Sequence, residues 1–364
     1  MHRRWLRRLV LVSVFALVVG ACGDDDGAGD SGEGLKVAFV YVGPIGDAGW
    51  TWAHDQGRLY LEENLPGVET TFLESVPEGA ESQRVFEDLA EDGYDLIFGT
   101  SFGYMDPMLA AAANYPDVAF EHATGFLQAD NLGNYFGAAE EGRYLTGLAA
   151  GAATTTNLIG YVAAFPIPEV LRGINAFTIG VREVNPDAQV QVIWTSTWFG
   201  PDLERQAAEA ALDAGADVIA MHQDSPAPGQ AAADRGAKWV GYNSDMSVFA
   251  PEAWLTAPVW DWGPFYLQRA REVLDGTWTS ESYYGNMAGG MVSLAPFGPS
   301  VSEETRGLIE SRRAAIIDGT FAIFVGPLYD QNGVLIYGEG VVPSLGELLG
   351  TGYFVEGVIG SPTG

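Results

Sequence analysis

The sequence predicts an α/β protein with two lobes, each built on a doubly wound parallel sheet. Strand-like apolar runs alternate with helix-like segments from residue 35 onward, which is typical of this fold class. The alternation pauses at the polar segment 154–157 and then restarts. The chain has 364 residues, and about 330 of them follow residue 34, more than one hydrophobic core usually holds.

The first half of the alternation begins with the apolar run 37–42, which ends at Gly43 and Pro44 and predicts a buried strand. The other strands expected in this half are 68–73, 95–98 and 118–122. The helices expected in this half are 50–64, 81–92, 106–115 and the Ala/Gly-rich segment 140–153. Residues 154–157, Thr-Thr-Thr-Asn, are expected to cross to the second lobe.

The second half follows the same plan, although we find no repeat at the level of individual residues. Its expected strands are 158–163, 190–194, 217–221 and 239–242. Its expected helices are 168–184, 203–214 and 229–235. A further strand begins at 255–259, and the helix 263–274 is expected to return the chain to the first lobe. Beyond residue 291 we expect a helix at 303–318 and strands at 321–325 and 334–338.

These elements divide the chain into two lobes. We expect lobe 1 at 35–153, with a returning segment at about 260–290. We expect lobe 2 at 157–258, with part of about 291–364.

The first 21 residues predict an export signal. A basic start at 2–8 precedes the apolar run 9–19, which is too short to span a bilayer. Val19-Gly20-Ala21-Cys22 resembles a bacterial lipobox, so Cys22, the only cysteine of the chain, is expected to carry lipid. The alternative is a single buried thiol. Residues 22–34 are acidic and glycine-rich and predict a flexible tether, which places the protein outside the cytoplasm, anchored to the cell membrane.

The charge of the chain excludes several classes of partner. Lys and Arg number 18 against 48 Asp and Glu, for a net charge of −30. This excess repels nucleic acid and anionic lipid headgroups, so neither is expected as a partner.

The segment 46–57, Gly-Asp-Ala-Gly-Trp-Thr-Trp-Ala-His-Asp-Gln-Gly, follows the first strand directly. It brings Asp47, Trp50 and Thr51 to the carboxyl edge of the sheet, where open α/β folds bind ligands. A flat ring beside a carboxylate and a helix start suits a planar, hydrogen-bonding ligand. The alternative is that Trp50 packs in the core of the first helix.

Aromatic and acidic residues also follow the other expected strands. In the first half these are Phe102, Tyr104, Asp106, Glu121 and His122. In the second half they are Phe165, Thr197, Trp198, Phe199, His222, Gln223, Asp224, Ser225, Asn243, Ser244, Asp245, Trp260, Asp261 and Trp262. Rings in loops have no core to fill by default, so we expect these groups to line one cleft. Trp194 lies within an expected strand and is expected to pack.

The sequence gives little support for an enzyme that acts on its ligand. His54, His122 and His222 lie near acidic residues, but their spacing does not enforce a metal site. The glycines form no Gly-x-x-x-x-Gly-Lys phosphate loop and no convincing dinucleotide fingerprint. We expect no cofactor, no metal and no enzymatic activity; the rival hypothesis is a metal-assisted surface hydrolase.

An ordered series of motifs resembles the basic membrane protein (BMP) family. The motifs are Gly46-Asp47-Ala48-Gly49-Trp50-Thr51, Glu141-Gly142-Arg143-Tyr144-Leu145-Thr146-Gly147, Val184-Asn185-Pro186-Asp187, Gly215-Ala216-Asp217-Val218-Ile219 and Gly241-Tyr242-Asn243-Ser244-Asp245. The resemblance implies a substrate-binding lipoprotein of an ABC importer, similar to purine nucleoside receptors. It also implies a type I periplasmic-binding-protein fold, whose two lobes are joined by three crossovers and close on the ligand.

The resemblance assigns roles to single residues. Asp47 and Asp106 match first-lobe contacts, Trp198 or Phe199 matches a stacking ring, and Asp245 matches an acidic contact that holds ribose in nucleoside binders. Those binders have a lysine where this chain has Trp260-Asp261-Trp262. The exchange of a cation for rings favours a nucleobase over a nucleoside.

The combined prediction is a monomeric receptor that captures a purine-like small molecule and delivers it to an ABC permease. The expected contacts are Asp47, Trp50, Thr51, Phe102, Tyr104, Asp106, Phe165, Trp198, Phe199, Asp224, Ser225, Asn243, Asp245 and Trp260. A sugar receptor of the same fold is the alternative, since pyranose rings also stack on Trp. A sensor role remains open beside transport.

Overall fold

Two six-stranded parallel sheets organise residues 34–364, the part of the chain that the computed structural model describes. The first sheet has the order β12(Ser282–Gly285), β5(Leu132–Gly137), β4(Ala119–Ala123), β3(Leu96–Gly99), β1(Lys36–Val40), β2(Glu69–Leu73). The second has the order β10(Trp254–Thr256), β9(Lys238–Val240), β8(Val218–His222), β6(Leu158–Ala163), β7(Gln189–Trp194), β16(Val358–Ile359). The predicted signal peptide, Cys22 and nearly all of the tether lie outside the described residues.

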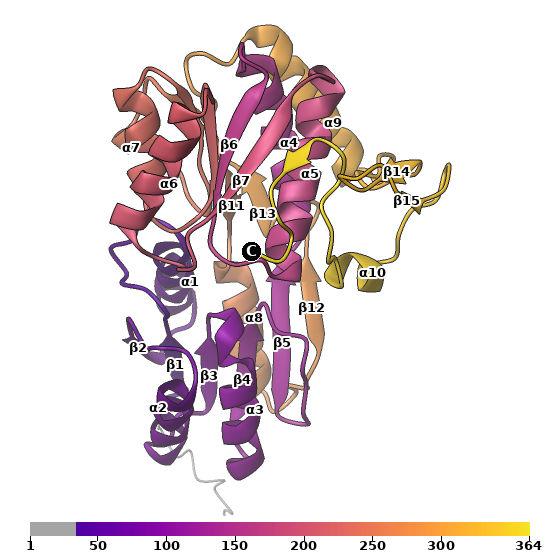
Figure 1. Ribbon diagram of the computed structural model, residues 1–364. Coiled ribbons are helices and arrows are strands. Elements are labelled where there is room, and N and C mark those ends of the chain that lie inside the picture. The colour runs from indigo at the N-terminus through magenta and orange to yellow at the C-terminus, as the bar shows by residue number, and fades with distance from the viewer. Residues whose placement is uncertain (1–33) are drawn as a thin grey trace, which may run out of the picture. The chain divides into compact units, whose positions relative to one another are not determined.

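Helices cover both faces of the first sheet, as Figure 1 shows. The helices are α1(Trp50–Asn64), α2(Ala80–Glu91), α3(Met105–Asn114) and α8(Gly263–Leu274), and a short turn, η1(Phe102–Tyr104), precedes α3. In β1, Val37 and Phe39 pack toward α1 and α8, whereas Ala38 and Val40 pack toward α2 and α3. Burial of both faces explains why this strand reads as a continuous apolar run.

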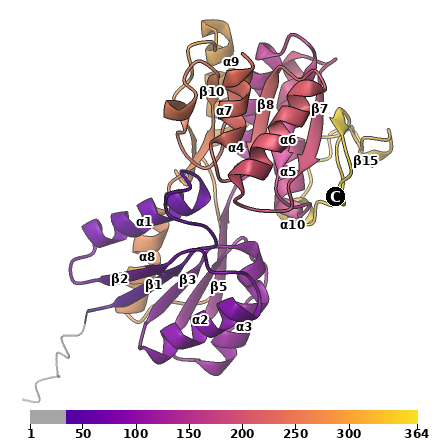
Figure 2. The ribbon, with the colours of Figure 1, turned by 60° about the vertical axis from the view of Figure 1, so that its left-hand side comes forward.

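The second sheet is covered in the same way. Its helices are α4(Ala139–Ala153), α5(Pro168–Val184), α6(Pro201–Asp213), α7(Ala227–Asp234) and α9(Glu303–Ile317). In β6, Tyr161 packs with α4 and α5, and the next residue, Val162, packs with α6 and α7. Figure 2 shows α6 and α7 side by side over this sheet.

Both sheets repeat one topology, with the strand orders β2-β1-β3-β4-β5 and β7-β6-β8-β9-β10. The predicted fold class, two doubly wound parallel sheets, is therefore confirmed. The remaining elements are η2(Ser247–Phe249), the antiparallel pair β11(Pro258–Trp260) and β13(Val292–Leu294), the hairpin β14(Leu328–Tyr329) and β15(Leu335–Tyr337), and α10(Leu345–Leu349). No helix within residues 34–364 combines the length and apolar character that crossing a membrane requires.

The chain passes between the two sheets three times. It leaves the first sheet after β5, returns to it after β11, and leaves it again between β12 and β13. We expected the first passage at 154–157, but α4 already packs against α5 and shares the core of the second sheet. We therefore propose that lobe 2 begins before Ala139.

The prediction of elements was incomplete or wrong in several places. The expected strand at 255–259 is divided into β10 and β11, and residues 321–325 form no strand. The strands and α-helix that were not expected are β5, β12, β13, β14, β16 and α10. The helix bounds Trp50–Asn64, Pro168–Val184 and Gly263–Leu274 agree with the expected ones.

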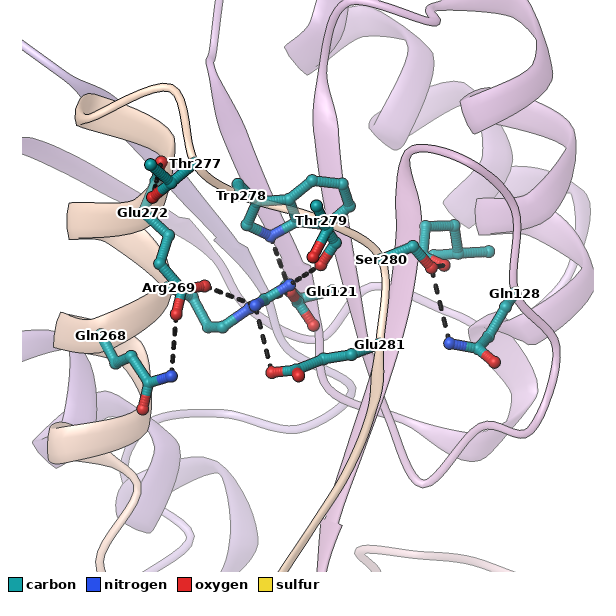
Figure 3. A network of polar contacts seen from close by, with 11 residues as sticks. Glu121, Gln128, Gln268, Arg269, Glu272, Thr277, Trp278, Thr279, Ser280 and Glu281 are labelled. Atoms are coloured by element: carbon teal, nitrogen blue, oxygen red, sulfur yellow. Dashed lines mark hydrogen bonds and ion pairs between the residues drawn. The ribbon is translucent and has the colours of Figure 1, made fainter.

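A buried arginine ties the returning helix α8 to the first sheet. Arg269 Nε lies 2.5 Å from Glu121 Oε1 at the centre of β4, and its Nη1 contacts both Glu272 and Glu281 (Figure 3). Trp278 Nε1 donates to the same Glu121 oxygen over 2.9 Å. Because Arg269 and Glu121 are both buried, each charge depends on the other, and the network fixes the segment that leads into β12.

Candidate ligand-binding site

A pocket lies where the carboxyl ends of the two sheets face each other. The first sheet contributes Val42, Trp50, Ser101, Phe102 and Thr124 to its wall, and the second contributes Glu169, Trp198, His222, Asp224 and Tyr242. The empty space among these side chains, including the solvent open to it, is about 340 Å³. The place suits a small ligand held between two lobes.

The residues on the first sheet's side arrive directly after strands. Val42 follows β1, Trp50 opens α1, and Ser101 and Phe102 follow β3. Thr124 follows β4 with a φ of 68°, which is unusual for a β-branched residue. Backbone strain of this kind gathers at binding sites, where the surrounding structure holds it.

The second sheet follows the same rule. Glu169 lies in the first turn of α5, which follows β6, and Trp198 follows β7. His222 ends β8, with Asp224 two residues later, and Tyr242 comes after β9. The matched topology of the two lobes thus places five side chains on each side of one space.

Four of the ten wall residues are aromatic, two from each lobe: Trp50, Phe102, Trp198 and Tyr242. Trp50 Nε1 donates to the carbonyl of Thr100 over 2.7 Å, which fixes the ring. Trp198 packs edge-to-face on Phe165, with 5.0 Å between ring centroids. These rings offer faces on which a flat ligand can stack.

Several buried polar atoms of the wall have no hydrogen-bond partner within residues 34–364. They are Thr124 Oγ1, Glu169 Oε2, His222 Nδ1 and the hydroxyl of Tyr242. Buried polar atoms are nearly always paired in folded proteins, so these atoms point to a partner from outside the chain.

Burial sets the protonation of the wall. It raises the pKa of Glu169 to about 7, with Arg172 and Arg143 acting in the opposite direction. Burial, followed by the charges of Asp47 and Glu204, also holds the pKa of Asp224 well above its ordinary value. Burial, helped by the two arginines, keeps the pKa of His222 well below its ordinary value, so its imidazole is neutral.

Two further residues support the wall without lining it. Asn243 donates from Nδ2 to Asp224 Oδ1 over 3.1 Å and accepts from Trp260 Nε1 over 2.9 Å. The Trp260 ring packs 4.8 Å from that of Trp262 and 6.2 Å from that of Trp50, measured between centroids. Asn243 therefore links Asp224 to β11, the strand that contains Trp260 and after which the chain returns to the first sheet.

The two lobes touch beside the pocket. Ser244 Oγ donates to the carbonyl of Ala48, which comes from the opposite lobe. A Cβ added to Gly49 would lie 2.3 Å from the carbonyl oxygen of Asp224. The turn before α1 is thus packed against the loop after β8 with no room for a side chain.

The structure brings some of the predicted contacts together at the pocket. Trp50, Phe102, Trp198 and Asp224 line it, whereas Phe165, Asn243 and Trp260 lie behind those residues. Asp47 caps α1 instead, because its carboxylate accepts the backbone N–H groups of Gly49, Thr51 and Trp52 at 2.8–2.9 Å.

Other predicted contacts lie elsewhere. Tyr104 is a core residue whose hydroxyl donates to the carbonyl of Val76 over 2.6 Å. Asp106 and Asp245 are exposed, and Asp245 accepts the N–H of Ser247. Ser225 donates to Glu204, and Thr51 and Phe199 do not line the pocket. We therefore leave these six residues out of the contact set proposed below.

The sequence analysis missed part of the wall. Glu169, Tyr242, Thr124, Ser101 and Val42 were not among the expected contacts, although each lies within a few residues of a strand's carboxyl end or in the first turn of the following helix. The position of each residue relative to the strands could therefore have identified it. The sequence analysis did not use this signal, because it considered only aromatic and acidic residues in loops.

A metal site has no donor cluster among residues 34–364, since no three His, Cys, Asp or Glu side chains gather there as ligands. His54 Nδ1 bonds the hydroxyl of Tyr266, and His122 Nε2 lies 2.7 Å from the carbonyl of Ser101. These two imidazoles are engaged within the first lobe.

A second pocket adjoins the first. It has an empty volume of about 620 Å³ and shares Phe102, Thr124 and Glu169 with the first pocket. The rest of its wall includes Phe126, Phe136, Tyr283 and Tyr284.

Comparison with known proteins decides the family. Residues 35–321 match the model of the Bmp family, described as ABC transporter substrate-binding protein PnrA-like. The chain belongs to this family. Members of the Bmp family bind a small molecule outside the cytoplasm and serve an ABC permease, a role in transport and not in catalysis.

Two relatives are equally similar in sequence. A purine-binding protein of Brucella abortus is 45% identical over 351 residues, which cover 96% of this chain and 98% of that protein. A putative ABC transporter glucose-binding protein of Haloferax volcanii is 45% identical over 306 residues, which cover 84% and 78% of the two chains.

Solved structures support the type I fold of Bmp proteins. An ABC transporter solute-binding protein from Aeropyrum pernix has a TM-score of 0.70 at 20% identity, covering 78% of this chain and 92% of that one. One from Conexibacter woesei has a TM-score of 0.65 at 20% identity, covering 79% and 97%. The type I periplasmic-binding-protein fold is therefore confirmed.

Proposed function

We propose that this Bmp-family protein captures a purine-like heterocycle, a free nucleobase in preference to a nucleoside, and delivers it to an ABC permease. The observation that carries the proposal is the pocket wall, with two aromatic rings from each lobe around buried carboxyl groups. Stacking contributes about 1–3 kcal/mol per base, and the carboxyl groups accept ring N–H donors. The purine-binding relative from Brucella abortus supports this ligand class.

The adjoining pocket supports a base without ribose. A ribose attached to a base in the first pocket would extend into this second space, whose wall is largely aromatic. Several of its polar groups are already paired: Asn134 accepts from Ser282 and donates to Leu127, and Arg172 contacts Glu140. The unpaired atoms Thr124 Oγ1 and Glu169 Oε2 belong to residues that it shares with the first pocket. With these two engaged by the base, few groups are left to bind sugar hydroxyls, so a nucleoside gains little from its ribose.

Calorimetric titration of the purified protein tests the proposal. Adenine, guanine, hypoxanthine and xanthine are titrated beside their nucleosides and glucose. We expect at least one base to bind at micromolar concentration or tighter and its nucleoside to bind more weakly. Binding of glucose with no response to any purine would overturn the assignment.

A sugar receptor is the second candidate, and the Haloferax volcanii relative, a putative glucose-binding protein, favours it. Pyranose rings also stack on Trp, and Asp224 and Glu169 are able to accept hydroxyl hydrogens. A glucopyranose also carries axial C–H groups on both of its faces, so rings on both sides of the space suit either ligand class. The titration with purines and glucose separates the two.

Lipid anchoring through Cys22 is part of the proposal, with the acidic segment 22–34 as the tether. Metabolic labelling with a radioactive fatty acid should mark the wild-type protein and leave Cys22→Ala unlabelled. Growth on the captured base as a nitrogen source, with and without the permease, separates transport from sensing. We expect a monomer, which sedimentation checks.

A further inference from the structure

Glu169 presents an unpaired carboxyl oxygen to the pocket. Its Oε2 has no hydrogen-bond partner within residues 34–364, and its side chain is only 12% exposed. Its Oε1 lies 3.8 Å from Nε2 of His222, too far for a hydrogen bond. A carboxylate in this position has capacity to accept hydrogens from a bound molecule.

Two arginines lie near Glu169. Arg172 Nε lies 3.2 Å from Glu140 Oε2, and its Nη1 donates to the carbonyl of Leu348. Arg143 donates from Nη1 to the carbonyl of Met221 over 2.7 Å, and its guanidinium lies 3.5 Å from the ring centroid of Tyr242. Its Nε and Nη2 have no hydrogen-bond partner within residues 34–364. Neither arginine forms a direct ion pair with Glu169 in the described residues.

Asp224 adds a second carboxyl group on the same side, whose raised pKa favours the protonated form. One of its oxygens takes a hydrogen from Asn243, and the side chain lines the pocket. The lobe 2 side therefore offers two carboxyl groups to the ligand, while the remaining polar groups are hydroxyls and a neutral imidazole, which adapt to either role.

We propose that Glu169, assisted by Asp224, is the specificity determinant of this site and selects uncharged heterocycles by their N–H donors. The inference rests on the proposed function. It predicts that an amino-substituted purine binds more tightly than the purine of the same shape that has an oxygen in place of the amino group. It also predicts that phosphorylated ligands are rejected.

Acceptor chemistry explains the preference. An ionised carboxylate accepts hydrogens and donates none, so an exocyclic amino group that faces it pairs with it, whereas an oxo group in the same place is repelled. Sites with a buried polar group discriminate strongly against a ligand that leaves that group unpaired. Exchange of the carboxylate for an amide supplies N–H donors and should reduce the discrimination.

Two matched pairs of ligands that are mainly uncharged at about pH 8 test the inference: adenine with hypoxanthine, and 2,6-diaminopurine with guanine. Within each pair an amino group is replaced by oxygen at one ring position. Titrations at about pH 8, above the pKa of Glu169 at about 7, keep its carboxylate charged. For the wild type we expect the amino member of at least one pair to bind more tightly by about tenfold or more.

Three variants complete the test. Glu169→Gln should reduce the ratio within that pair by about tenfold, whereas Glu169→Asp keeps the charge and should keep the order of preference. Glu304→Gln is the control, because Glu304 lies in the first turn of α9 as Glu169 does in α5 but is exposed and outside the pocket. Thermal melts of each variant establish that it is folded.

The outcomes separate the inference from the proposed function. A wild-type preference that Glu169→Gln reduces and Glu304→Gln preserves supports the inference. Purine binding whose amino-to-oxo ratio is the same in the wild type and in Glu169→Gln overturns it and leaves the proposed function standing. If no purine binds, both are wrong.

Discussion

Two tryptophans near the end of β7 should have different roles, one in ligand binding and one in stability. Trp198 faces the pocket, whereas Trp194 stacks on Phe354 with 6.3 Å between centroids and donates to the carbonyl of Ser361. We expect Trp198→Ala to lower ligand affinity by about tenfold to a hundredfold with a small change in melting temperature. Trp194→Ala should lower the melting temperature and spare affinity. Calorimetry and thermal unfolding of both variants check this, and the opposite pattern would reverse the two roles.

Buried carboxyl groups should make the protein more stable in acid than in base. Burial raises the pKa of Asp47 to about 6 and those of Glu141 and Glu169 to about 7. Between about pH 4 and pH 7 the folded protein therefore holds protons that the unfolded chain has released, and this stabilisation is lost as the pH rises.

We accordingly expect the free energy of unfolding of the ligand-free protein to fall between about pH 5 and pH 8. Each pKa unit corresponds to about 1.4 kcal/mol for a fully buried group, and less for the partly exposed Glu141. Urea titrations in high salt, which screens the net charge of −30, measure the local effect. Glu169→Gln should flatten the profile, and stability that rises toward pH 8 would contradict the assignment.

At the residue scale, the sequence predicted which strand ends supply the pocket more reliably than which side chains point into it. Trp50 and Trp198 line the pocket as expected. Asp47 has the expected place but caps a helix, because three backbone N–H groups point at its carboxylate. A turn that is one residue longer or shorter would move a side chain from the pocket to a helix cap or to the core. Contacts distant in sequence determine which of these places the side chain takes.

At the element scale, α4 and α5 pack closely through glycines. A Cβ on Gly180 would lie 2.1 Å from the carbonyl oxygen of Tyr144, and one on Gly147 would lie 2.1 Å from that of Phe177. Such approaches admit no methyl group without movement of one helix. Together α4 and α5 cover one face of the second sheet.

We expect Gly180→Ala to lower the free energy of unfolding by about 1–3 kcal/mol. The matched control is Gly307→Ala in α9, where no atom lies within 4 Å of the added Cβ. That change should raise stability by about 0.5–1 kcal/mol, because alanine is the better helix former. Chemical denaturation measures the free energy of unfolding of both variants. Equal changes would mean that α4 and α5 move apart easily enough to admit the methyl group.

Element prediction succeeded where the periodicity was long and failed where it was short. The helices at Trp50–Asn64 and Pro168–Val184 have 15 and 17 residues, which gives the helical periodicity several turns over which to show. Strand β5, Leu-Gly-Asn-Tyr-Phe-Gly, has two glycines and an asparagine, and its register comes from β4 and β12 on either side. Pairing within the sheet, and not local propensity, makes it a strand.

At the scale of the whole molecule, Gly49 sets how closely the lobes approach beside the pocket. Because a Cβ there would lie 2.3 Å from the carbonyl oxygen of Asp224, Gly49→Ala should favour an arrangement with the lobes further apart. We expect weaker ligand binding with little change in stability, since each lobe keeps its own core. Gly46→Ala is the control, because nothing lies within 4 Å of its added Cβ.

Small-angle scattering with and without ligand measures this effect. Gly49→Ala should show a larger radius of gyration in the presence of ligand than the wild type or Gly46→Ala does. Equal radii and equal affinities for all three proteins would mean that the contact between Gly49 and Asp224 does not limit closure.

The meeting of two similar lobes was predictable from the repeated alternation of strands and helices, and so was the edge at which they meet. The position of the first passage between them was not, because α4 has the composition of either lobe and its partner is α5. We propose that helix packing across the break at 154–157 sets this position.

The outermost strand of the second sheet comes from the far end of the chain. Strand β16 runs parallel to β7, with Val358 opposite Val190 and Ile359 opposite Gln191. A chain shortened to residue 354 would leave β7 with an uncovered row of amide and carbonyl groups, along which a neighbouring molecule can add as an extra strand. Such a shortened protein should elute as large species in gel filtration, so recombinant versions need their final ten residues to stay dispersed.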